Sequence, residues 1–198
     1  MIPFERSPSG AIVATFSSVE AELISSLATQ VAGLLGSVAA RSDDPELAGT
    51  GIGGSSRMDT DPAIARLLPN AYSGDDDASQ EFRQLTERGL ASRKIDNAVT
   101  VLKTLAPIAS ADATLAGITD AELSDEALEF GEEISLDAAD ALAWMRALTD
   151  IRLTIAARLG IVTDEDVIDE EDEQAVVLAD VYGWLGMVTE SLVEAVDQ

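Results

Sequence analysis

The stretch "LAWMRALTDIRLTIAARLG", from Leu142 to Gly160, has the pattern of an amphipathic helix. At 100° per residue, most of its apolar side chains fill one continuous arc of the helix surface. Arg146 and Asp150 fall outside that arc at i, i+4 spacing, so we predict that they form an exposed ion pair. The arc is wide enough to need a partner surface, which favours a helical fold built around this segment.

Arg152 is the exception in this stretch, because its position falls inside the apolar arc. An unpaired guanidinium in an apolar environment is costly, so we predict a buried structural charge that meets a carboxylate of another helix. Asp96, Asp180 and Glu81 are the candidate partners. The alternatives are that Arg152 contacts a partner protein or binds a ligand.

Capping residues and apolar spacing predict further helices along the chain. Ser17 and Glu20 have the spacing of a capping box, and Asp61 followed by Pro62 is typical of a helix start. Asp137 is expected to cap the helix that contains the opening stretch. The expected helices occupy residues 18–40, 61–69, 137–160 and 173–196, with two more inside 77–106 joined by a turn at 88–94.

The remaining segments have turn, loop or strand character. Ile2–Arg6 and Ala11–Phe16 flank the turn sequence SPSG, which predicts a short N-terminal β-hairpin. Residues 107–135 look irregular, with a brief extended segment at 132–136, and 41–60 is expected to be a flexible loop. The predicted fold class is therefore mainly α: one compact domain over residues 1–198, with five to seven helices and a short hairpin.

The composition excludes several chemistries. The chain has 198 residues and contains no cysteine and no histidine. Disulfides, thiol nucleophiles, Cys/His zinc sites and imidazole acid–base catalysis are thereby excluded. The acidic run at 164–173 lacks the spacing of an EF-hand loop and is predicted to be a solvated connection. We expect no catalytic residue, no cofactor and no metal, and therefore a protein that is not an enzyme.

The charge balance bears on the choice of partners. Twelve basic residues against 37 acidic ones give a net charge of −25, which disfavours nucleic acid as a ligand. Five basic residues nevertheless cluster across the predicted helix–turn–helix-like unit. They could contact DNA or an acidic partner, or form a solvated face that pairs with nearby acids. These residues are Arg83, Arg88, Arg93, Lys94 and Lys103.

The distribution of apolar residues also bears on the cellular location of the protein and on whether it forms a homodimer. No apolar run approaches the roughly 20 residues of a membrane span, and the first ten residues lack a secretory signal. We therefore expect a cytoplasmic protein that does not contact membranes. The two wide apolar stripes, at 142–159 and 177–195, would also suit a helical homodimer. Trp144 and Trp184 lie on these stripes and are predicted to belong to a shared core.

Four stretches occur here in an order that resembles a known family: DPAIARLLPNAY (61–72), EFRQLTERGLASRKIDNAVTVLKTL (81–105), WMRALTDIRLTIAARLGI (144–161) and VYGWLGMVTESLVEAV (181–196). The family is an actinobacterial domain of unknown function that includes the oxidative-stress transcriptional regulator AosR. Its genes lie near the ClpS protease adaptor and cysteine-synthesis genes. The resemblance implies a transcriptional regulator in redox and cysteine homeostasis, acting with a stress sigma factor and RNA polymerase.

One departure from the family limits this implication. The regulatory role in the family is tied to a closely spaced cysteine pair that forms a disulfide, and this chain has no cysteine. It cannot sense oxidants in that way. We therefore keep two hypotheses: a small cytoplasmic regulator that acts through protein partners and DNA, or a non-enzymatic adaptor. Such an adaptor would contact basic partners of the protease-adaptor or sulfur-carrier machinery.

Overall fold

The computed structural model describes residues 1–39, 61–69, 76–115, 131–163, 166, 168–169 and 171–198, and within its longest helix the side chains of residues 86–108. The elements in these ranges are β1 (Ile2–Arg6), β2 (Ile12–Phe16), α1 (Ser18–Ala39), α3 (Pro62–Leu67), α4 (Asp76–Leu115), β3 (Glu132–Leu136), α6 (Ala138–Arg158) and α7 (Glu173–Asp197). The mainly helical class and the N-terminal hairpin are thus confirmed. The loop expected at 41–60 lies outside the described residues.

The strands form one small antiparallel sheet in the order β1-β2-β3. The segment expected to be extended at 132–136 is its third strand, with Ala14 opposite Ile134 in the register. Gly10 adopts a φ of +87° in the β1–β2 turn, a conformation that glycine takes without steric cost. Gly131 precedes β3 where a Cβ atom would lie 2.3 Å from the Phe16 carbonyl oxygen, so the close approach of the two strands requires a glycine.

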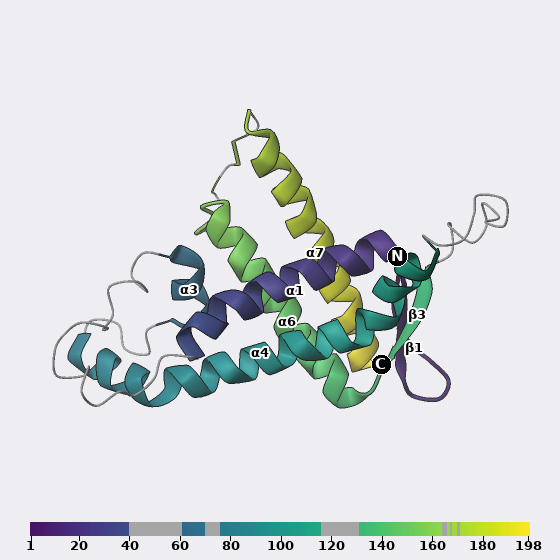
Figure 1. The fold of residues 1–198 in the computed structure, drawn as a ribbon, viewed down its shortest axis with the longest axis horizontal. Coiled ribbons are helices and arrows are strands. Elements are labelled where there is room, and N and C mark those ends of the chain that lie inside the picture. Colours follow the sequence, from purple (N-terminus) through teal and green to yellow (C-terminus); the bar gives the residue numbers. More distant parts are fainter. Residues whose placement is uncertain (40–60, 70–75, 116–130, 164–165, 167, 170) are drawn as a thin grey trace.

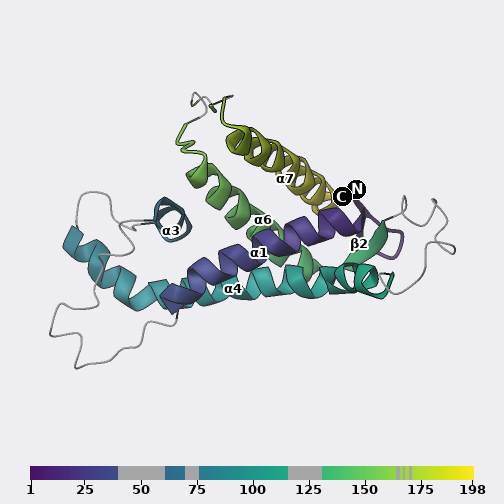
Figure 2. The same ribbon diagram turned by 45° about the horizontal axis from the view of Figure 1, so that its top comes forward.

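Helices α1 and α4 run side by side, and α6 packs against both of them (Figures 1 and 2). Helix α7 packs on α6 and on β1, while the short α3 packs on α6. The first and last residues both lie at the sheet end of the molecule (Figure 1). The other ends of α6 and α7 extend away from the sheet, and the sites described below lie toward these ends.

A heptad pattern pairs α1 with α4. In α1 the buried residues are Ala21, Ile24, Ala28, Val31, Leu35 and Val38, and in α4 they are Ala91, Ala98, Val101, Leu105 and Ile108. Both sets repeat every seven residues, which is the spacing of helices packed as in a coiled coil. The alanines in both sets have small side chains, so the axes of the two helices can approach closely.

The expected turn at 88–94 is wrong, because α4 is one continuous helix of 40 residues. The buried residues of α4 instead repeat every seven positions along one continuous helix, because they face α1 as in a coiled coil. Gly89 has no heavy atom within 4 Å of its Cβ position and costs only helix propensity. The helix also continues through Pro107, so the irregular segment begins later than expected.

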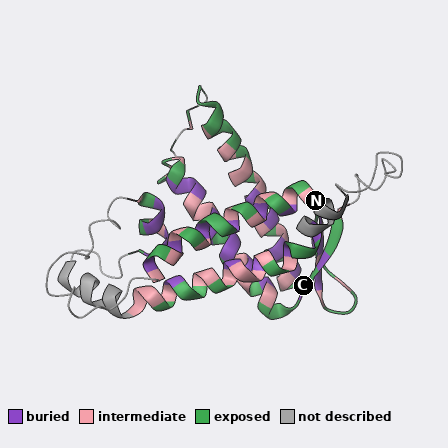
Figure 3. Cartoon of the chain, in the orientation of Figure 1, coloured by how far each residue is buried: buried purple, intermediate pink, exposed green. Residues whose placement is uncertain are grey.

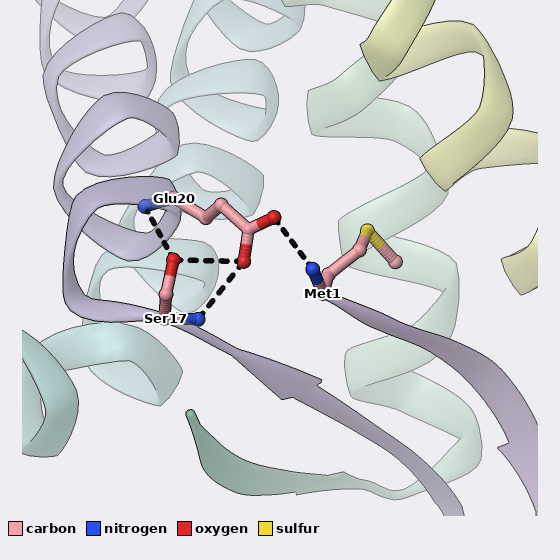
Figure 4. A network of polar contacts seen from close by, with 3 residues as sticks. All are labelled: Met1, Ser17 and Glu20. Atoms are coloured by element: carbon pink, nitrogen blue, oxygen red, sulfur yellow. Dashed lines mark hydrogen bonds and ion pairs between the residues drawn. The ribbon is translucent and has the colours of Figure 1, made fainter. Parts of the chain in front are cut away.

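The capping residues act as expected. Ser17 donates its backbone N–H to the Glu20 carboxylate at 2.9 Å, and the Glu20 N–H donates to the Ser17 hydroxyl at 3.3 Å (Figure 4). The N-terminal ammonium of Met1 adds an ion pair at 2.6 Å. Burial raises the pKa of Glu20, but these hydrogen bonds and the ammonium charge outweigh it and hold the pKa below its usual 4.5.

The other helix ends follow the same local rules. Asp61 accepts a hydrogen bond from Ala63 N at 2.9 Å, and Asp137 accepts one from Ala139 N at 2.8 Å. Gly160 ends α6 with a φ of +71°, and the next residue donates its N–H to the Ala156 carbonyl at 2.9 Å. This is the Schellman arrangement, in which a glycine lets the chain satisfy the last carbonyls of a helix.

The sheet end contains an aromatic core around Trp144. Its ring lies 5.7 Å from that of Phe4 and 5.9 Å from that of Phe16, measured between centroids. The indole N–H donates to the Thr104 hydroxyl at 2.8 Å. The hairpin is therefore fastened to α6 and α4 through one buried side chain, whereas Trp184 is only partly buried.

Candidate functional site

The five basic residues singled out in the sequence all belong to α4, but they do not form one free cationic surface. Arg93 and Lys103 are exposed, Arg88 and Lys94 are half-buried, and the side chain of Arg83 lies outside the described residues. Because α4 is continuous, the helix–turn–helix-like unit expected here is wrong. No second helix begins at Arg93 to address a DNA groove.

Lys94 forms an ion pair with Asp150 of α6. Asp150 is 3% exposed and is the only buried charged residue in the part of the chain that the structure describes. Burial raises the pKa of Asp150 above its usual 3.8, although the hydrogen bond and charge of Lys94 oppose this. The expected exposed pair of Arg146 with Asp150 is therefore wrong, because Asp150 is buried and pairs with Lys94 of α4.

Arg152 lies two residues after Asp150 and faces a different helix. Its guanidinium carbon is 4.8 Å from the centroid of the Tyr182 ring in α7, a cation–π contact. It also packs against Gly186, with one nitrogen 3.6 Å from the Cβ position of that glycine. Two residues span about 200° on a helix, so Asp150 meets α4 while Arg152 meets α7.

The predicted carboxylate partner of Arg152 is not present among the described residues. The ion pairs of these residues do not include Arg152, and its buried Nε has no hydrogen-bond partner. Asp96 and Asp180 are both exposed, and the side chain of Glu81 lies outside the described part. An aromatic ring thus takes the place that we expected a carboxylate to fill.

Helix α7 is covered unevenly along its length. Its buried residues, Leu185, Val188, Leu192 and Ala195, all lie in the half nearer the sheet. The expected apolar face continues to Val177, yet that residue is 63% exposed. Figure 3 shows the part of α7 far from the sheet without buried segments. Val176 and Val177 there are exposed, whereas Leu178 and Val181 are partly buried against the core.

We define the outer face of α7 as six exposed residues that fall within an arc of about 140° at 100° per residue: Val176, Val177, Asp180, Met187, Glu190 and Glu194. Met187 is as exposed as Val177, at 63%. Half of the outer face is apolar and half acidic, and the sequence of α7 contains no lysine or arginine. This combination is the candidate functional site.

The outer face is not evident from the sequence, because Val177 falls on the apolar stripe predicted at 177–195. One feature of the sequence does point to this face: the 25 residues of α7 are rich in valine and leucine and include acidic residues but no basic one. Periodicity alone could not show which of these apolar residues a neighbouring helix covers.

Two further properties of the described residues bear on the site. Helices α1 and α7 are long and apolar enough to cross a membrane by length and composition, a test that the core helices of soluble proteins also pass. In the described part of the chain, no group of three or more acidic residues is arranged to hold a metal ion.

Comparison with known proteins identifies the family. The model described as Domain of unknown function (DUF2017) matches residues 1–196. No curated protein matches the chain, and no solved structure does. The match spans nearly the whole chain, so the protein belongs to this family, and the expectation of an uncharacterised domain family is confirmed.

Proposed function

We propose that this member of the DUF2017 family is a regulatory protein, not an enzyme, that acts by binding a protein partner through the outer face of α7. The observation that supports the proposal is the exposure of Val177 and Met187, each 63%, on a helix without basic residues. Exposed apolar residues that gather on one helix face are typical of protein contact sites. An amphipathic helix of this kind fits into an apolar groove of a partner.

The acidic residues of the outer face determine which kind of partner groove would complement it. Asp180, Glu190 and Glu194 lie among the apolar residues of the outer face, so a groove edged by lysine or arginine complements them. A second copy of this chain would bring the same acids together, and their repulsion disfavours a symmetric homodimer through this face. Anionic membranes would repel it for the same reason.

The process that we propose is transcriptional regulation in oxidative stress or cysteine homeostasis, in the cytoplasm. It follows from the resemblance to the oxidative-stress regulators, and it makes a stress sigma factor or RNA polymerase the candidate partner. Because the chain has no cysteine, regulation in this proposal does not depend on a thiol switch. An adaptor of the protease or sulfur-carrier machinery would use the same face with a different basic partner.

The test measures binding of the full chain to purified RNA polymerase, with and without stress sigma factor. Met187→Asp is expected to weaken binding about tenfold or more, because it places a charge in the apolar part of the contact. Val19→Asp is the matched control, since Val19 is 72% exposed on α1 and lies outside the proposed face. Equal affinities of the two variants would overturn the role of the outer face.

Two further arms separate the alternatives. Promoter DNA is titrated with the chain alone and with polymerase, and Arg93→Gln tests the exposed part of the basic cluster. Binding of DNA by the chain alone that Arg93→Gln abolishes would replace the proposal by a direct DNA contact. If polymerase and sigma factor do not bind at all, the transcriptional role is refuted, and Met187-dependent binding to a purified protease adaptor or sulfur carrier would then support the adaptor.

A further inference from the structure

A small cavity lies at the end of α6 and α7 that is far from the sheet. Its volume is about 230 Å³, and α3, α6, α7 and the segment at 161–163 contribute its lining. Two arginines reach it from different helices, Arg66 from α3 and Arg152 from α6. Tyr182 of α7 and the hydroxyl-bearing Thr149 and Thr163 also line it. A chain with only twelve basic residues thus brings two of them to one cavity.

Within the described part of the chain, the guanidinium of Arg152 is held in place without an acid. Tyr182 stacks on it at 4.8 Å, and Gly186 leaves room for it on α7. Its Nε is buried and has no hydrogen-bond partner. A buried donor is nearly always satisfied in a folded protein, so this orphaned N–H group points to a ligand that the cavity accepts.

Arg66 also retains binding capacity. It donates to the Ile161 carbonyl, which fixes its position beside the cavity. It forms no ion pair within the described residues, and a guanidinium has five N–H donors. A carbonyl oxygen does not neutralise the charge, so the cation remains available to a ligand.

The charge of Arg66 influences the pKa of Asp166, but the Asp166 carboxylate already accepts other hydrogen bonds. Its carboxylate accepts the backbone N–H groups of Val162 and Thr163, each at 2.6 Å. These hydrogen bonds, the one from Thr163 first, hold the pKa of Asp166 below its usual 3.8, and the charge of Arg66 contributes least. The nearby Arg158 is paired with Asp61 at 3.0 Å. Asp61 and Asp166 are thus already engaged with other partners.

We propose that this cavity binds a small molecule with a phosphate or carboxylate group, which Arg152 and Arg66 hold together. Planar guanidinium groups match the two oxygens of such a group and bind it through paired hydrogen bonds. Tyr182 forms a wall against which the remainder of the ligand packs. The site is distinct from the outer face of α7, so it provides a way for a small anion to act on the protein independently of the proposed partner.

Inorganic phosphate and succinate are the probes, each titrated into the full chain at constant ionic strength set with sodium chloride. The readout is the NMR signal of the Arg152 Nε–H group, together with the melting temperature. We expect a saturable shift of this signal and a rise in melting temperature with at least one probe. The identity of that probe distinguishes a phosphate from a carboxylate ligand. Chloride alone should produce neither effect.

Variants assign the effect to the cavity. Arg152→Gln and Arg66→Gln should each reduce the affinity for the probe at least tenfold, whereas Arg146→Gln, at an exposed position of the same helix, should leave it unchanged. If Arg152→Gln does not fold, Arg66→Gln on α3 still decides. The absence of a saturable response to both probes, or the same loss in Arg146→Gln, would overturn the proposal.

Discussion

The two ends of the α6–α7 pair differ in how their side chains are satisfied. At the sheet end, Trp144 is fully buried between two phenylalanine rings and its N–H group has a partner. Toward the far end, Trp184 at the middle of α7 is only partly buried, Val177 is mostly exposed, and the partner of Arg152 among the described residues is an aromatic ring. We therefore expect the sheet end to contribute more to stability, and the far end holds the groups on which the two binding proposals rest.

The largest expected effect compares the two tryptophans. Trp144→Ala removes a fully buried ring and should lower the free energy of unfolding by about 3–5 kcal/mol. Trp184→Ala should cost less than about 2 kcal/mol, because part of that ring is already in water. Urea denaturation followed by circular dichroism measures both. Equal losses of unfolding free energy in the two variants would mean that the ring of Trp184 is packed as tightly as that of Trp144.

The next comparison concerns two cations on opposite sides of α6: Lys94 of α4, and Arg152 of α6 itself. Lys94→Met leaves Asp150 buried without its partner and should cost about 3 kcal/mol at neutral pH. This cost should shrink as the pH falls toward the raised pKa of Asp150, because a protonated carboxyl needs no cation. Arg152→Met breaks no ion pair and should cost less than about 1 kcal/mol.

A double variant separates the contribution of the Lys94–Asp150 ion pair to stability from the contribution of apolar packing at the same positions. Lys94→Met combined with Asp150→Leu should recover most of the stability lost in Lys94→Met, since an apolar pair of similar size often replaces a buried ion pair without loss. If Lys94→Met alone is as stable as the natural chain, Asp150 is not a buried charge.

The smallest effect concerns the carboxylates with lowered pKa at each end. The stability contributed by Glu20 is fully present above its unfolded pKa of about 4.5 and is lost as the pH falls through the lower folded value. Glu20→Gln should therefore cost about 1 kcal/mol at pH 7 and less in acid. Asp166→Asn, in the exposed connection at the far end, should leave global unfolding unchanged. Denaturation curves from about pH 3 to pH 7 measure the two slopes.

Helix ends were predictable from the sequence because a cap is a contact between residues two to four positions apart. Asp61, Asp137 and the Ser17–Glu20 pair all cap as predicted. The continuity of α4 was not predictable from the pattern that we used, which sought a period of 3.6 residues. The positions of Ala91, Ala98 and Leu105 have a period of 3.5, which becomes meaningful only with a partner helix of the same period.

The candidate sites were predictable in part only. Arg152 was recognised as a charge inside an apolar arc, and it does lie between α6 and α7. Its ring partner could not be foreseen, because acids are the usual partners of a buried arginine and Tyr182 lies 30 positions away. The exposure of Met187 was likewise hidden, since an apolar residue has the same periodicity whether or not a partner covers it.

The helical class, the hairpin, the caps and the chemistries excluded by the lack of cysteine and histidine all follow from the amino-acid sequence alone. These depend on residue type and on short separations along the chain. The packing of the helices in space is what pairs Lys94 with Asp150, brings Arg152 and Arg66 to one cavity, and leaves Val177 and Met187 of α7 exposed. Such assignments depend on which helix faces which residue in space, and local periodicity does not specify the neighbour.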